Sequence, residues 1–241
     1  MSLWSALAAA VSAIQSGGAQ LLDRLATLVG GGEARNSVAF TAAMIALSAK
    51  MAKADGVVTT DEEVAFFSLF DIPHGEERNV ARVFDLAKQD VAGFDAYARR
   101  IAGLFVDQPE TLVDILDGLF HIAKADGYIH EAELVYLETV AEIFGIEQRA
   151  FDQICERHVI SGADPYKVLG VDRSASDDEV RRVYRKQVME SHPDRLIARG
   201  VPEEFVRIAN DRVAALNEAW RKISLERGHR PTISGEGERA S

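Results

Sequence analysis

Residues 180–195 read VRRVYRKQVMESHPDR, a basic run in a helical pattern that stops at the tripeptide His192-Pro193-Asp194. Proline disfavours the α conformation of the residue before it, so we expect the helix to end at about Ser191 or His192. The imidazole and the carboxylate would then lie on a loop at the end of a positively charged helix. Because no nucleophile, second base or set of metal ligands accompanies them, this stretch is typical of a protein-binding surface rather than of an enzyme site.

The basic side chains of this helix are expected to lie on its outer side. Spacings of four residues place Arg181 above Arg185 and Arg182 above Lys186. Stacked like charges cost an isolated helix roughly a few tenths of a kcal/mol per pair, a cost that an acidic partner on this face would offset. The side chains that we expect on or near the inward stripe are Val180, Val183, Tyr184 and Val188.

The composition is that of a globular protein with two domains. The chain has 241 residues, of which 47% are hydrophobic and 27% charged, and this length suffices for two cores. Residues 1–161 carry 12 basic and 24 acidic side chains, whereas residues 162–241 carry 15 and 14. Nucleic-acid binding needs a basic footprint, so the acidic first part argues against it.

The single cysteine, Cys155, excludes an internal disulfide and suits a reducing compartment. It is expected to pack as a small apolar residue.

Residues 3–14 form an amphipathic leader, with Leu3, Leu7, Val11 and Ile14 on one helical face. No basic residue precedes it, so the positive region of a signal peptide is missing, and the run is too short to span a bilayer. We expect the helix to dock on the body of the protein or to form a dimer with a second copy. The alternative is peripheral contact with a membrane, although the basic residues that favour anionic lipid are missing. The expected location is the cytoplasm, with the inner face of the cytoplasmic membrane as the alternative.

The segment between residues 36 and 161 is predicted to be all-α, because nothing in residues 1–161 alternates with period two. A GGG run at residues 30–32 separates it from the leader. The predicted helices span residues 36–54, 60–70, 76–89, 91–105, 109–124, 131–144 and 147–157.

An internal repeat runs through this segment. The sequence AKADG occurs at residues 52–56 and again at 123–127, each time with an acid seven positions after the aspartate. Two copies of a helix–turn–helix unit predict a pseudo-symmetric bundle. The repeated acids could hold Ca²⁺ or Mg²⁺, or they could be helix caps, since Thr59 and Glu62 have the spacing of a capping box. The candidate metal ligands are Asp55, Glu62, Asp126 and Glu133, with Glu63 or Glu131 as further candidates; no other cofactor is expected.

The duplicated Lys-Ala-Asp-Gly units within residues 36–157 resemble the all-helical TerB-like fold of tellurite-resistance proteins. The resemblance implies a fold and an acidic surface with a potential for metal binding, and it implies no defined activity.

The C-terminal part begins after Gly162-Ala163 with a helical turn at residues 164–171, which a glycine ends. Ser174 or Ser176 can cap the basic helix, whose first turn carries three acids. A loop is expected over residues 195–202, and a long helix over 203–227. The inward residues of the long helix are predicted to be Phe205, Ile208, Val213, Leu216, Trp220 and Ile223, and residues 230–241 are predicted to be disordered.

Residues 164–227 resemble a J-domain, the co-chaperone module that stimulates DnaK-type ATPases. The resemblance rests on the ordered set Asp164-Pro165-Tyr166, Leu169-Gly170-Val171, Tyr184-Arg185-Lys186, His192-Pro193-Asp194-Arg195 and Leu216-Asn217-Glu218-Ala219-Trp220. Together with residues 196–202 and the TerB-like segment upstream, this set resembles the DjlA family. The departures from the usual J-domain pattern are Gln187, Ser191, Val213 and Trp220, and the membrane-spanning segment for which DjlA is known is not found.

Gln187 stands where a leucine is usual. A buried glutamine without a partner costs roughly 1–3 kcal/mol. We expect the helix to be rotated slightly, so that Val188 takes the inward position.

The resemblance implies a bacterial, non-enzymatic co-chaperone of a DnaK-type chaperone. Its first domain would direct it to an unidentified client or to a stress signal; the alternative is a metal-responsive or tellurite-stress binding module that recruits chaperones. The predicted domains are 1–35 (leader and linker), 36–161 (TerB-like), 162–228 (J-domain) and 229–241 (tail). The residues expected to bind the chaperone are His192, Pro193, Asp194, Arg181, Arg182, Arg185, Lys186 and Arg195.

Overall fold

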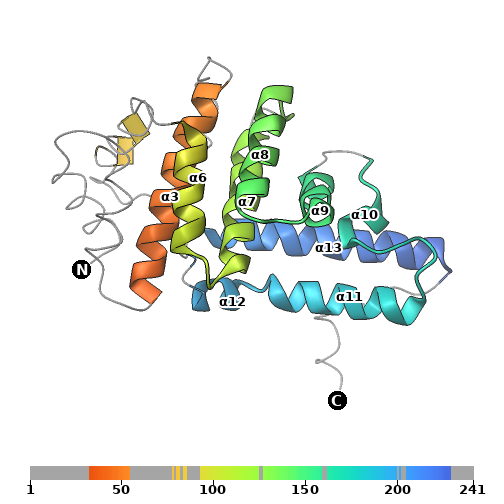
Figure 1. Ribbon diagram of the computed structural model, residues 1–241. Coiled ribbons are helices and arrows are strands. Elements are labelled where there is room, and N and C mark those ends of the chain that lie inside the picture. Colours follow the sequence, from red (N-terminus) through yellow and green to blue (C-terminus); the bar gives the residue numbers. More distant parts are fainter. Residues whose placement is uncertain are drawn as a thin grey trace.

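The computed structural model describes residues 33–54, 78, 80–81, 84–85, 93–124, 127–158, 162–199, 201 and 205–228. All regular structure in these ranges is helical, which confirms the all-α prediction. Figure 1 shows the helices of the first domain standing beside one another and the long helix of the second domain crossing beneath them. The predictions for the leader, the 60–70 helix and the tail lie outside the described residues. The helices are α3 (Glu33–Ala54), α6 (Phe94–Leu104), α7 (Pro109–Ala123), α8 (Glu131–Ile143), α9 (Gln148–His158), α10 (Pro165–Leu169), α11 (Asp177–Glu190), α12 (Pro193–Ala198) and α13 (Val206–Glu226).

The first domain packs around α3 and α7. Between Ala39 and Met51 every side chain of α3 is buried, and α7 is buried on nearly all sides. A helix that is buried all round belongs at the centre of a core, so α3 and α7 form the centre against which α6, α8 and α9 pack. The Tyr136 hydroxyl of α8 donates a hydrogen bond to the backbone oxygen of Leu47 in α3 at 2.8 Å, which links these two helices. Among these described residues, no helix is long and apolar enough to cross a membrane.

The second domain is built on the antiparallel pair α11 and α13 (Figure 1). The Tyr184 and Trp220 rings stack between the two helices at 5.1 Å, and the Tyr184 hydroxyl donates to the Asn217 amide oxygen at 2.9 Å. Ser176, rather than Ser174, caps α11, because its hydroxyl accepts from the backbone amide of Glu179. The core of the pair consists of Tyr166, Val168, Leu169, Val180, Tyr184, Leu216, Ala219, Trp220 and Ile223.

The side chain of Gln187 has the hydrogen-bond partner that a partly buried amide requires. Its side-chain amide donates to the backbone oxygen of Leu169 at 2.9 Å, so the polar group is satisfied although it is partly buried. Val188 packs against the core of the second domain as expected. α11 ends at Glu190, as the proline at position 193 predicts.

The prediction of a loop over residues 195–202 is wrong, because residues 193–198 form α12. Leu196 of this helix is 1% exposed and lies in the core of the first domain. Phe205 and Ile208, which were expected to face the second domain's core, also pack in the first domain, where the Phe205 ring meets Phe40 edge to face at 4.7 Å. The hydrophobic pattern indicates which face of a helix is buried, but it does not indicate the element that covers it.

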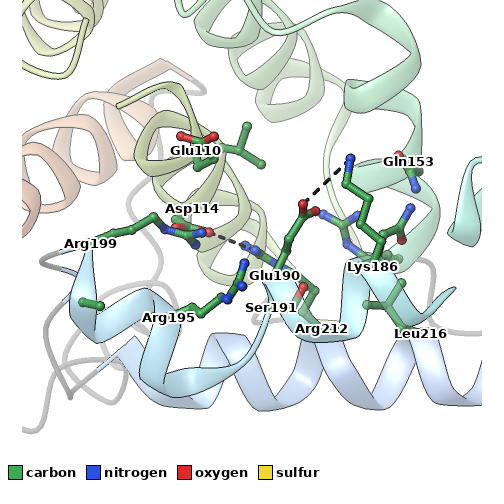
Figure 2. Close-up of a pocket in the computed structure, with 14 residues that line it drawn as sticks. Glu110, Asp114, Gln153, Lys186, Glu190, Ser191, Arg195, Arg199, Arg212 and Leu216 are labelled. Carbon is green, nitrogen blue, oxygen red and sulfur yellow. Dashed lines mark hydrogen bonds and ion pairs between the residues drawn. The ribbon is translucent and has the colours of Figure 1, made fainter. Parts of the chain in front are cut away.

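A buried ion network joins the two domains, and Figure 2 shows Asp114, Arg199 and Arg212 of it. We define it by Asp114 and Asp117 of α7, Arg199 at the end of α12 and Arg212 of α13. Arg212 donates to Asp114 Oδ1 at 2.8 Å and to Asp117 Oδ2 at 2.7 Å, and Arg199 donates to Asp114 Oδ2 at 2.6 Å. The Arg212 side chain is 8% exposed and the two aspartates are less exposed still. Asp114 therefore holds arginines from two different helices of the second domain.

Two residues of α9 complete this network. His158 Nε2 lies 2.8 Å from Asp117 Oδ1, and an Arg157 nitrogen lies 3.4 Å from the same oxygen. Burial by itself would raise the pKa of Asp117, but the charges of Arg212 and Arg157 and the contact with His158 hold it well below its usual value. Burial lowers the pKa of His158, against the opposing effect of Asp117, so His158 is neutral in the folded protein near pH 7.

The buried histidine predicts a loss of stability on mild acidification. The pKa of His158 is lower in the folded state than the unfolded value of 6.5, so the unfolded chain binds more protons as the pH falls through that value. Burial lowers the pKa of His121 in the same direction. We expect the free energy of unfolding, measured with urea, to decrease between pH 7.5 and pH 5.5, with a slope of at most about 1.4 kcal/mol per pH unit for each histidine. His158→Gln should reduce the slope, and an unchanged slope in this variant would contradict the assignment.

Candidate functional site

The tripeptide His192-Pro193-Asp194 forms the first turn of α12. His192 is the N-cap, and its Nδ1 accepts a hydrogen bond from the Asp194 backbone amide at 3.2 Å. Proline at the first helical position is favoured there, since its missing N–H would have no partner in the helix. The His192 and Asp194 side chains are 59% and 87% exposed and lie 3.6 Å apart. Because Nδ1 accepts, a neutral imidazole carries its proton on Nε2, which makes it available as a donor to a partner.

A shallow hollow of about 460 Å³ lies beside the tripeptide. Val188 and Met189 of α11 give it an apolar floor, and Met189 is 53% exposed. Arg185 and Arg195 line it together with His192 and Asp194. The hollow therefore combines apolar area with two cations and an exposed hydrogen-bonding pair.

The predicted basic face of α11 is exposed. Arg181, Arg182 and Arg185 are exposed and form no ion pair within the part of the chain that the structure describes. Lys186 lies 3.8 Å from Glu190 one turn along the helix. Arg185 borders the hollow, whereas Lys186 faces the other way, toward the first domain. Among the predicted binding residues, Arg185, His192 and Asp194 line the hollow, Lys186 lines a second surface, and Arg195 lines both.

The second surface is a cleft of about 750 Å³ between the domains (Figure 2). The first domain contributes Glu110, Val113, Asp114, Gln153 and Arg157; the second contributes Lys186, Glu190, Arg195, Arg199 and Arg212, among others. Sequence reasoning missed this cleft and the roles of Arg199 and Arg212. The sequence did contain a signal for the role of Arg212. This arginine lies on the otherwise apolar side of a predicted helix, one residue before Val213.

Of the four repeated acids, the described residues include Glu133. Asp55, Glu62 and Asp126 lie outside the described residues. Glu133 is 1% exposed, and its carboxylate accepts from the backbone amide of His130 at 2.8 Å, as one half of a capping box at the start of α8. The capping box predicted for the first copy, at Thr59 and Glu62, lies outside the described residues; Glu133 is the equivalent of Glu62 in the second copy. No group of three or more ligating side chains occurs in the described ranges, and the metal site stays a prediction.

Cys155 is half-buried against the core of the first domain. Burial raises the pKa of its thiol to about 12, and the nearby charge of Asp152 adds to this effect. The thiol is therefore protonated at neutral pH, as expected for a residue that packs as a small apolar side chain.

Comparison with known proteins agrees with this two-part architecture. Residues 41–156 match the family described as tellurite resistance protein TerB, and residues 164–226 match the DnaJ domain. The co-chaperone protein DjlA of Photobacterium profundum is 31% identical over 218 residues, which cover 78% of each chain. The chain belongs to the DjlA family.

Other DjlA proteins match over much of their length. The DjlA of Vibrio vulnificus is 27% identical over 235 residues, covering 83% of this chain and 82% of the relative. The DjlA of Coxiella burnetii is 27% identical over 194 residues, covering 72% of each. No solved structure matches the chain. The predicted family is confirmed, with a TerB domain followed by a DnaJ domain, and the relatives are co-chaperones.

Proposed function

We propose that this DjlA-family protein stimulates ATP hydrolysis by a DnaK-type chaperone and acts through the exposed tripeptide at residues 192–194. The observation that carries the proposal is the hollow beside the tripeptide, where the exposed His192 imidazole and two arginines line exposed apolar area. Such a surface suits a partner that presents carboxylates around an apolar contact. In this proposal the chain supplies the binding surface, and ATP is hydrolysed on the chaperone.

The basic face of α11 supports the first step, which is association. Arg181, Arg182 and Arg185 form no ion pair within the described residues. A partner's carboxylates could therefore bind these arginines without displacing an existing acidic partner. Clustered exposed charges of one sign accelerate encounter with an oppositely charged surface, and the effect falls with salt. His192 and Asp194 would then contact the chaperone and bias it toward hydrolysis.

The TerB domain would direct the module to a client or to a stress signal. This part of the proposal rests on the match of residues 41–156 to a tellurite-resistance family. A DnaK-type partner that uses ATP supports the predicted cytoplasmic location, which stays a prediction, as do the membrane contact and the dimer predicted for residues 3–14.

The test is the rate of ATP hydrolysis by a purified DnaK-type chaperone at increasing concentrations of the full chain. We expect a saturable increase, and no increase would overturn the proposal. Arg185→Glu should raise the half-saturating concentration roughly tenfold at low salt, because it reverses a steering charge at the edge of the hollow. Arg99→Glu, the same charge change at an exposed position of α6, should leave the curve unchanged. Equal effects of the two variants would contradict a docking role for α11.

A further inference from the structure

We propose that the TerB domain positions the tripeptide, and that Asp114 and Asp117 are positioning residues for the co-chaperone reaction. The inference rests on the proposed function and names how the same site is controlled. Its basis is the interdomain ion network defined above, which attaches the helix that carries the tripeptide to α7 of the first domain.

α12 is the mechanical link between the network and the tripeptide. His192 caps its N-terminus, and Arg199 follows its last residue, so the two lie at opposite ends of one short helix of roughly 9 Å. Arg199 binds Asp114, and Leu196 in the middle of α12 is buried in the first domain's core. The middle and the far end of α12 are therefore held by the first domain, while its N-terminal end presents the tripeptide to solvent.

α13 provides the second attachment. Ile208 and Ala209 lie in the core of the first domain, whereas Leu216 and Trp220 lie in the core of the second. Arg212 is at the changeover between these two halves, where it binds both aspartates. Because one continuous helix belongs to both cores, the second domain cannot tilt away from the first without breaking this ion network.

The ionic contacts supply direction that the apolar contacts lack. Hydrophobic burial is not directional, but an arginine that binds two carboxylates fixes both distance and orientation. Asp114 uses one oxygen for Arg212 and the other for Arg199, so a single side chain fixes α12 relative to α13. Near the start of α13, the edge-to-face contact of Phe205 with Phe40 adds an apolar attachment to the first domain.

The test compares Arg199→Gln with wild type in the ATPase titration. Arg199 is less buried than Arg212, so its loss should leave the protein folded. We expect the maximal stimulation to fall about fivefold and the half-saturating concentration to change less than twofold, because the basic face of α11 is intact. Arg199→Lys should restore part of the maximum. Arg207→Gln, at an exposed position of α13, is the matched control and should behave as wild type.

A double-mutant cycle with Asp114→Asn distinguishes positioning from independent effects. If Asp114 acts through Arg199, the double variant should stimulate no less than the more affected single variant. A purely structural role would instead lower the folded fraction, which unfolding curves of each variant measure. Folded variants that stimulate to the wild-type maximum would overturn the inference.

Amide hydrogen exchange tests the positioning without the chaperone. In Arg199→Gln we expect the backbone amides of residues 194–199 to exchange at least tenfold faster, while those of residues 180–190 keep their wild-type rates. Unchanged exchange at 194–199 would overturn the inference. A wild-type protein that fails to stimulate ATP hydrolysis would overturn the proposed function instead, and the exchange result would still decide whether the first domain fixes α12.

Discussion

His192→Gln is expected to abolish stimulation of the chaperone's ATP hydrolysis while the protein stays folded. The imidazole is 59% exposed, and within the described residues its hydrogen-bonding and ionic contacts are with Asp194. Loss of an N-cap costs about 0.5–2 kcal/mol at most, whereas the exposed Nε2–H is the group that we assign to the chaperone contact. The measurement is single-turnover ATP hydrolysis with saturating variant, together with circular dichroism of the free protein.

His130→Gln is the matched control for this experiment. His130 is also the N-cap of a helix, α8, and it is exposed, but it lies in the first domain, away from the tripeptide. The same substitution there should retain full stimulation. If His192→Gln stimulates like wild type, or if both variants lose stimulation equally, the assignment of the tripeptide is refuted.

Arg212→Met is expected to destabilise the protein by about 3–5 kcal/mol, because it leaves two buried carboxylates without their main counter-charge. The Arg212 side chain is 8% exposed, and burial, which alone would lower the pKa of its guanidinium, is outweighed by Asp117 and Asp114, which raise it. The measurement is urea unfolding followed by far-ultraviolet circular dichroism at pH 7.5. We expect a single transition in wild type, since α13 belongs to both cores.

Arg221→Met provides the comparison for this prediction. Arg221 is on the same helix and pairs with Glu218 at 2.7 Å, but its side chain is 44% exposed. Exposed pairs contribute about 0–1 kcal/mol, so this variant should stay within about 0.5 kcal/mol of wild type. Equal losses for the two variants would mean that water reaches Asp114 and Asp117, contrary to the observed burial.

The sequence predicts the local structure of this protein closely. α7 and α8 begin at the residues expected from Pro109 and from the acids at 131 and 133, and α11 ends where Pro193 requires. These boundaries depend on interactions between residues a few positions apart. The basic face of α11 follows in the same way, because its exposure is set by the period of one helix.

The contacts between the domains depend on tertiary structure alone. Arg212 and Asp114 are 98 positions apart, and Arg199 and Asp114 are 85 apart. No local pattern links such residues, and a charged side chain on a predicted helix is ordinarily solvated. Only the folded chain shows that Arg212 is buried and paired.

By itself, the sequence determined that the chain is helical, that a TerB-like domain precedes a J-domain, and that His192, Pro193 and Asp194 lie at the end of a basic helix. The tertiary structure decided that residues 193–198 form a helix and that Phe205 and Ile208 pack against the first domain. The physical reason is that hydrophobic periodicity specifies which face of a helix leaves water, whereas the surface that covers this face is chosen by the shape and charge of the whole folded chain.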